Sequence, residues 1–191
     1  MVFNEAMKKL IQTTILIALY SSSSLACSLV GEPTITWTAF KTPKKVGVPG
    51  TFTSVTRKGD SRADTLSSLL ESQMVTIDST EISTKNPARD KKIVKFFFGA
   101  LAEKKFTAKF KKASKSSVTM ELNFNKIKKD IPLEVNLKGS EMTLNGHLDI
   151  LDFELMDGLA AINKACYALH EGKTWSHVTL TVKQKVKGCN N

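Results

Sequence analysis

The chain has 191 residues, 41% of them hydrophobic. This length is enough for one domain with a sizeable core but short for two domains of ordinary size. Its 28 lysine and arginine side chains outnumber 18 acidic ones, and a formal net charge of +10 suits nucleic acid, an anionic membrane surface or acidic polymers. Three cysteines with no Cys-x-x-Cys spacing argue against redox or zinc chemistry.

The N-terminal segment predicts export. Lys8 and Lys9 precede an apolar stretch over residues 10–20, and Ala26 follows a run of serines. A charged start, an apolar centre of about eleven residues and a small residue before the cut are typical of a secretory signal peptide. A membrane-spanning helix would need about twenty apolar residues. We therefore expect a signal peptide over residues 1–26 and a single mature domain over residues 27–191.

Cys27 leaves two routes of maturation open. Ser24-x-Ala26 satisfies the small-x-small rule for ordinary release, whereas Leu25-Ala26-Cys27 is similar to a bacterial lipobox, in which Cys27 would carry a lipid. The lipobox usually has its large aliphatic residue one position earlier. Soluble export and lipid anchoring through Cys27 therefore both remain open.

The first part of the mature chain predicts three strands. Residues 34–41 and 46–52 alternate apolar and polar side chains, and residues 75–77 mark a third strand. Alternation places one face of a strand against a dry interior and the other in water. Between the second and third strands, residues 66–70 are compatible with a helical turn.

A helix is expected next, beginning at Asn86. Asn86 can cap it, Pro87 suits the first turn, and apolar residues recur at helical spacing up to Leu101. The run Phe96-Phe97-Phe98 is too aromatic for a solvated helix. We expect it to pack as a plug into or over the apolar face of the sheet.

The segment over residues 105–150 repeats the alternating pattern four times. The apolar positions fall in residues 106–110, 118–124, 131–137 and 142–150, and the breaks between them are short. Short connections are typical of hairpins, so neighbouring strands should be antiparallel.

A second helix and a last strand complete the chain. Apolar residues at spacings of three and four over residues 157–170 predict the helix, with Asp157 as cap and Gly172 as its terminator. Alternation over residues 178–186 predicts the eighth strand. Eight antiparallel strands predict a mainly β fold, an antiparallel barrel with two helical insertions; a two-layer sandwich is the alternative.

Export lets two cysteines persist as a disulfide. Cys166 and Cys189 are expected to pair and to pin the C-terminus to the second helix, which closes a loop worth about 3 kcal/mol in the chain-entropy model. The competing possibility is two free thiols, one of them buried.

One stretch carries a family resemblance. Residues 77–86, with the sequence IDSTEISTKN, are followed by Arg89-Asp90, and this pattern resembles the signature of the bacterial YceI-like family. Gly50-Thr51-Phe52 is similar to the family's glycine-x-phenylalanine in the second strand. The likeness covers roughly residues 34–187. The chain departs from the pattern at residues 98–101 and 127–130, which would alter the rim of the family's binding tunnel.

The resemblance implies a fold and a function. Family members are exported proteins with an eight-stranded, lipocalin-like barrel around an apolar tunnel for polyisoprenoids or other long-chain amphiphiles. It therefore implies the barrel over the sandwich, a periplasmic location and a long-chain lipid as ligand, with no other cofactor. The expected ligand-binding residues are the large apolar side chains of inward parity: Trp37, Phe52, Phe97, Phe106, Phe110, Leu122, Phe124, Leu137, Leu144 and Leu180.

Catalysis has little support in the sequence. The nucleophile-elbow, P-loop and metalloprotease motifs are absent, and His147, His170 and His177 share no ligand spacing, so we expect surface histidines, no metal site and no enzyme. Arg89 and Asp90 are assigned to capping and to salt bridges that tie the loop.

The positive charge leaves a second class of function open. Lysines of outward parity should make the exterior basic, which suits an anionic membrane surface, whereas nucleic acid is not expected because the aromatic residues share the apolar parity. We therefore expect a protein that stores or carries lipid. The rivals are a membrane-surface or structural interaction module with a side-chain-filled barrel, and a lipid-modifying enzyme.

Overall fold

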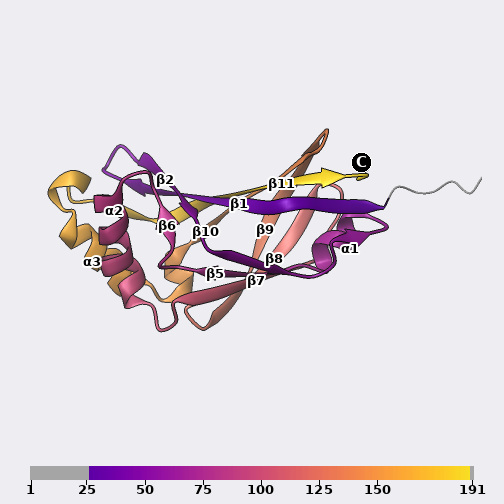
Figure 1. The fold of residues 1–191 in the computed structure, drawn as a ribbon. Helices are drawn as coiled ribbons and strands as arrows, with labels where there is room; N and C mark the ends of the chain where they lie inside the picture. Colours follow the sequence, from indigo (N-terminus) through magenta and orange to yellow (C-terminus); the bar gives the residue numbers. More distant parts are fainter. Residues whose placement is uncertain (1–25, 190–191) are drawn as a thin grey trace, which may run out of the picture.

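The two longest strands, β1 (Cys27–Lys41) and β11 (Thr174–Lys187), run side by side along the molecule in the computed structural model, which describes residues 26–189 (Figure 1). Both are longer than the alternation predicts. β1 continues toward the N-terminus past a bulge between Val30 and Thr34, where Gly31 has a φ of 69°. A bulge interrupts the alternation of side chains, so the sequence pattern hides the first part of the strand.

One antiparallel sheet contains all the strands. Its hydrogen-bonded order is β3-β5-β7-β8-β9-β10-β11-β1-β2-β6, and β4 pairs with the start of β1. The remaining strands are β2 (Val46–Phe52), β3 (Val55–Lys58), β4 (Arg62–Ala63), β5 (Met74–Asp78), β6 (Ile82–Ser83), β7 (Lys105–Lys111), β8 (Ser117–Phe124), β9 (Ile127–Lys138) and β10 (Glu141–Asp149).

A bent segment brings the two ends of this sheet together. β2 pairs with β1, and β3, which follows after two residues, pairs with β5. Across the bend, the Thr53 amide donates to Glu81 O at 2.8 Å and the Asp78 amide to Ser54 O at 3.2 Å. The sheet is therefore the predicted lipocalin-like barrel. The strand count differs, because the short strands β3, β4 and β6 lie outside the eight predicted strands.

Helices occupy both ends of the barrel (Figure 1). α1 (Leu66–Glu71) lies beside the start of β1, whereas α2 (Pro87–Lys92) and α3 (Met156–Ala165) lie at the opposite end, which we call the helical end. A buried face of α1, formed by Leu66, Leu69 and Leu70, closes its end of the core.

The two predicted helices begin close to the expected residues but end earlier. Asn86 caps α2 by accepting from the Arg89 amide, as predicted, but the chain then passes into a π-helical turn (Ile93–Phe97) and a 3-10 turn (Phe98–Ala100). α3 stops at Ala165, and Ala168–His170 form a separate 3-10 turn. Arg89 donates to Thr84, and Asp90 accepts from it, so hydrogen bonds tie this loop where salt bridges were expected.

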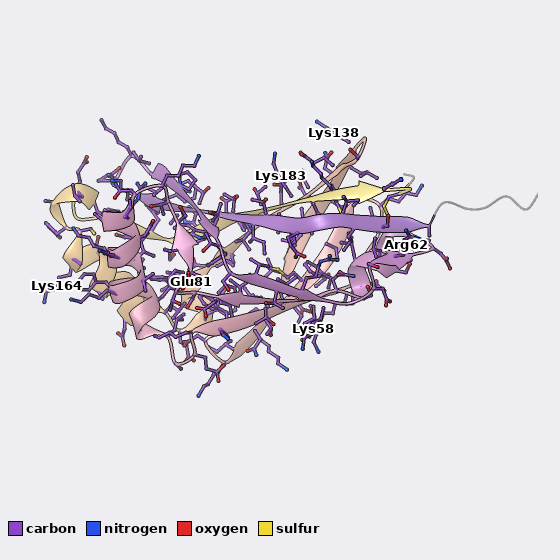
Figure 2. The ribbon with its side chains drawn as sticks, in the orientation of Figure 1. Lys58, Arg62, Glu81, Lys138, Lys164 and Lys183 are labelled. Carbon is purple, nitrogen blue, oxygen red and sulfur yellow. A yellow bond between two sulfur atoms is a disulfide. The ribbon has the colours of Figure 1, made fainter. Side chains whose placement is uncertain are left out.

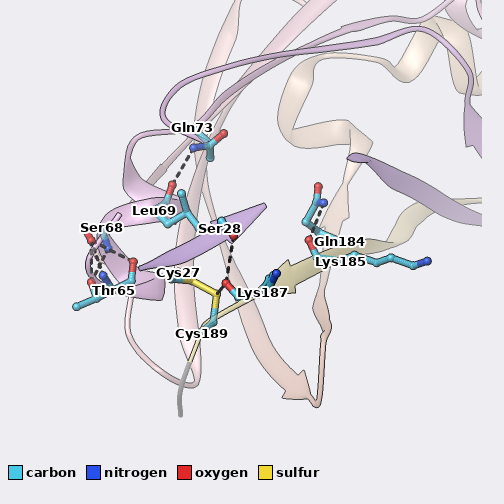
Figure 3. Close-up of a disulfide and its surroundings, with 10 residues drawn as sticks. All are labelled: Cys27, Ser28, Thr65, Ser68, Leu69, Gln73, Gln184, Lys185, Lys187 and Cys189. Atoms are coloured by element: carbon cyan, nitrogen blue, oxygen red, sulfur yellow. Dashed lines mark hydrogen bonds between the residues drawn. A yellow bond between two sulfur atoms is a disulfide. The ribbon is translucent and has the colours of Figure 1, made fainter. Parts of the chain in front are cut away.

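The prediction that Cys166 pairs with Cys189 is wrong. Cys189 forms its disulfide with Cys27, with a Cα–Cα distance of 4.3 Å (Figure 3). The cause is the unforeseen start of β1: Ser28 pairs with Lys187 in the β1–β11 register, which places the neighbouring cysteines together. Cys166 follows α3 at the helical end, where its thiol is free and buried.

Candidate functional site

A cavity of about 510 Å³ lies inside the sheet. Its volume falls within the range of about 300–1,000 Å³ that is usual for small-molecule sites. The cavity wall extends from Leu70 in α1 to Ile162 in α3, so the cavity follows the length of the barrel.

Alternation in the strands determines which side chains form the wall. In β8, Val118, Met120, Leu122 and Phe124 are all buried, whereas the residues between them are partly exposed. Because every other residue of a strand faces the interior, each strand contributes a row of apolar groups. The charged side chains labelled in Figure 2, among them Lys58, Lys138 and Lys183, lie on the outside of the ribbon.

The structure brings nearly all of the predicted ligand-binding residues to this wall. Leu137 is the exception: it packs against the hydrophobic core but does not line the cavity. The residues that do line it are Trp37, Phe52, Phe97, Phe106, Phe110, Leu122, Phe124, Leu144 and Leu180.

Aromatic rings form a connected path through the interior. Phe52 lies 6.4 Å from Trp37 and 5.4 Å from Phe106, measured between ring centroids, and Phe106 lies 4.9 Å from Phe124. Phe98 is buried, and its ring centroid lies 6.3 Å from that of Phe52. Part of the aromatic run after α2 therefore packs into the core as the predicted plug. Such tilted pairs are favourable beyond the apolar area they bury.

The wall is cationic at the helical end. Lys41, Arg89 and Lys92 line the cavity there together with His170 and Thr174. Within the described part of the chain, no acidic side chain lines the cavity. Lys41 was within reach of sequence reasoning, because it has the same parity in β1 as Trp37.

His170 belongs to this group, contrary to the expectation of a surface histidine. Its Nδ1 lies 2.7 Å from Thr174 Oγ1, which in turn donates to Asn163 Oδ1 at 2.8 Å. Burial lowers the pKa of His170, and the positive charges of Lys41 and Lys92 lower it further. The ring is therefore neutral near pH 7.

Two buried amides line the opposite end of the cavity. Gln73 Nε2 donates to Leu69 O at 2.9 Å, and Gln184 Nε2 donates to Lys185 O at 3.0 Å (Figure 3). Gln184 Nε2 also donates to Val30 O at 2.9 Å. Sequence reasoning missed Gln184 although it shares the inward parity of β11. Both amides hold neighbouring backbone in place. Arg57 lines the same end, where its Nη1 donates to Gln73 Oε1 at 3.3 Å and its Nε lies 4.0 Å from Glu32 Oε2.

Among residues 26–189, no group of three or more His, Cys, Asp or Glu side chains could hold a metal ion. No helix in the same region has the length and hydropathy needed to cross a bilayer.

A curled antiparallel sheet around one elongated apolar cavity defines a lipocalin-like fold. The chain belongs to the YceI-like family, because the family model of the YceI-like domain matches residues 30–186. No curated protein matches the chain.

Solved structures share the fold at low sequence identity. A polyisoprenoid binding domain from Saccharophagus degradans, implicated in plant cell wall breakdown, is 14% identical with a TM-score of 0.60, over 85% of this chain and 98% of that one. Burkholderia cenocepacia BcnA is 14% identical with a TM-score of 0.55, over 81% and 96% of the two chains. The Campylobacter jejuni YCEI protein is 19% identical with a TM-score of 0.51, over 74% and 86%.

Proposed function

We propose that the protein binds a long-chain amphiphilic lipid, such as a polyisoprenoid, in its cavity and stores or carries it in the bacterial cell envelope as a binding protein rather than an enzyme. The observation that carries the proposal is the elongated cavity of about 510 Å³ with its wall of apolar strand residues. Family membership and the polyisoprenoid-binding domain among the similar structures support it. The envelope location rests on the signal-peptide pattern, which lies outside the described residues except for Ala26.

Burial explains how such a cavity could bind a chain with few polar groups. Each methylene group transferred from water to an apolar wall contributes about 0.8 kcal/mol. The alternating strand residues provide such contacts along the whole cavity, and the aromatic path adds broad surfaces.

A substitution that fills the cavity tests the proposal. Ala108, 4% exposed, lies in the cavity wall, whereas its neighbour Thr107 has the opposite parity in β7. We expect Ala108→Phe to weaken binding of a fluorescent polyisoprenoid at least tenfold, about 1.4 kcal/mol. Thr107→Phe should bind like the wild type because its ring lies outside the barrel.

Native mass spectrometry provides the second measurement for the same proteins. The purified wild type and Thr107→Phe should carry one lipid each, and Ala108→Phe should carry less. A wild-type protein that neither retains nor takes up a lipid would exclude lipid binding and leave a side-chain-filled barrel as the alternative.

Exposed apolar side chains favour a second, compatible function at a membrane surface. Met156, Tyr167 and Leu169 are 65%, 66% and 63% exposed, and all three belong to α3 or the turns that follow it. Leu169 also lines the cavity. Lys164 and Lys173 lie close in sequence, and basic residues near an anionic bilayer each contribute about 1 kcal/mol. We propose that the helical end rests on anionic lipid while the ligand is exchanged.

Liposome cosedimentation tests this contact. We expect the wild type to bind vesicles that contain an anionic phospholipid, and moderate salt to weaken the binding through screening. The double variant Tyr167→Ser/Leu169→Ser should bind several-fold less. Val30→Ser is the control, because Val30 is 46% exposed but lies near the disulfide at the other end. Equal loss in both variants would contradict a contact made by the helical end.

A further inference from the structure

Two lysines at the helical end have no acidic partner among residues 26–189, although half-buried charges usually have one. Lys41 and Lys92 are both partly buried in the cavity wall. Among residues 26–189, neither forms a salt bridge; the contact that Lys41 makes is a 3.4 Å hydrogen bond from its Nζ to Leu169 O. Removal of a charge from water is costly unless an opposite charge or a strong acceptor compensates it. A negative group bound at this end of the cavity would therefore compensate the charges of Lys41 and Lys92.

Arg89 also lines this end of the cavity, and two hydrogen bonds to Thr84 hold its side chain in position. Its Nε donates to Thr84 Oγ1 at 2.8 Å and its Nη2 to Thr84 O at 2.9 Å. Both acceptors are neutral, but the Thr84 hydroxyl also donates to Asp90 Oδ1, so the nearby Asp90 carboxylate compensates part of the Arg89 charge. Asp90 does not line the cavity, so among the described residues the charged side chains in the wall at this end are Lys41, Arg89 and Lys92, all of them positive.

His170 can respond to a negative group by taking up a proton. Since Thr174 Oγ1 donates to Asn163, it accepts from His170 Nδ1, and the neutral ring then has its lone pair at Nε2. Asn163 Nδ2 donates to Gly172 O at 3.1 Å, which fixes this chain of hydrogen bonds to the backbone. The charged groups that face the ring are Lys41 from β1 and Lys92 from α2. An anion placed among them would offset their repulsion and favour the imidazolium form.

We infer that the helical end of the cavity binds the anionic head group of the lipid, a phosphate or a carboxylate, through Lys41, Lys92 and His170. The inference rests on the proposed function, because the tail must occupy the apolar part of the cavity. An anionic head group would distinguish the ligand of this protein from neutral long-chain lipids such as alcohols. The orientation follows: the head group lies between α2 and β11, and the tail extends toward the disulfide.

Matched ligands test the head group separately from the tail. An isoprenoid alcohol, the monophosphate and the carboxylic acid of the same chain length are titrated into the wild-type protein. We expect the monophosphate to bind at least tenfold more tightly than the alcohol. If the carboxylic acid also binds more tightly than the alcohol, the negative charge is the property that the site recognises. Equal affinities for all three would overturn the head-group inference and keep lipid binding. No binding of any would instead overturn the proposed function.

Charge-removing substitutions locate the site. In Lys41→Gln/Lys92→Gln, the preference for the monophosphate should fall to within about threefold, while affinity for the alcohol stays at its wild-type value. Lys58→Gln/Lys138→Gln is the matched control, because it makes the same change in net charge at lysines on the outside (Figure 2). An unchanged preference in the first variant, or an equal loss in both, would overturn the assignment to these two lysines.

The titration of His170 provides a readout that does not depend on affinity. Followed by NMR at the ring C–H groups, the pKa of His170 should rise when the monophosphate binds and should not rise when the alcohol binds. His147, which is exposed on β10, serves as the internal reference. The same His170 titration in both complexes would place the anion elsewhere and overturn the inference.

Discussion

Replacement of Cys189 by serine is expected to lower the free energy of unfolding by about 4–5 kcal/mol, because the disulfide joins residues 162 positions apart. In the chain-entropy model, a cross-link lowers the conformational entropy of the unfolded chain, and this effect grows with the length of the closed loop. Here the loop includes almost the whole domain. The native contacts change little, since Cys27 remains a buried thiol next to α1.

Urea unfolding of the oxidised proteins measures this effect. Wild-type protein treated with a reductant should unfold at the same urea concentration as Cys189→Ser. Cys166→Ala is the control, because Cys166 is free, and it should cost about 1 kcal/mol or less. If Cys189→Ser and the oxidised wild type had the same midpoint, the disulfide would contribute nothing to stability.

Gly50→Ala is expected to have the second largest effect on stability. The indole of Trp37 lies directly over Gly50 in the neighbouring strand, so a Cβ at this position would overlap the ring. Trp37 is 7% exposed and its ring lies near Phe52, which leaves it little space to move except into the cavity. Overpacking of this kind typically costs about 1–3 kcal/mol.

The same substitution should therefore reduce both stability and lipid capacity. We expect a lower thermal midpoint and weaker binding of a fluorescent polyisoprenoid, together with a changed tryptophan emission. Gly99→Ala is the matched control, because its Cβ would meet no atom closer than Val94 O at 3.6 Å. Wild-type stability and affinity in Gly50→Ala would show that the barrel wall adapts without displacing Trp37.

Periodicity predicts the wall of the cavity because strand parity is a local property. The inward rows of β7 and β8 follow directly from alternation, and so does the position of Phe106 and Leu122 in the wall. Parity could also have predicted that Lys41 and Gln184 face the interior, because both are polar residues at inward positions of their strands. The rule for a strand predicts which face a residue occupies, whatever its chemistry.

Features that depend on distant parts of the chain could not be predicted in this way. The pairing of Cys27 with Cys189 requires the register of β1 against β11, and the bulge at Gly31 obscures that register. The half-buried position of His170 depends on how the turn after α3 folds back against β11. Such positions are fixed by packing between elements rather than by the spacing of residues within one.

Cys27, the first residue of the expected mature chain, can either form the disulfide or carry a lipid, but not both. A sulfur atom that is bonded to Cys189 has no valence left for the thioether through which a lipid would anchor Cys27. The oxidation and the lipid transfer would therefore compete for one atom, and the faster reaction would decide the product. One product would be a cross-linked protein free to diffuse; the other would be tethered to a membrane, with Cys189 left as a thiol.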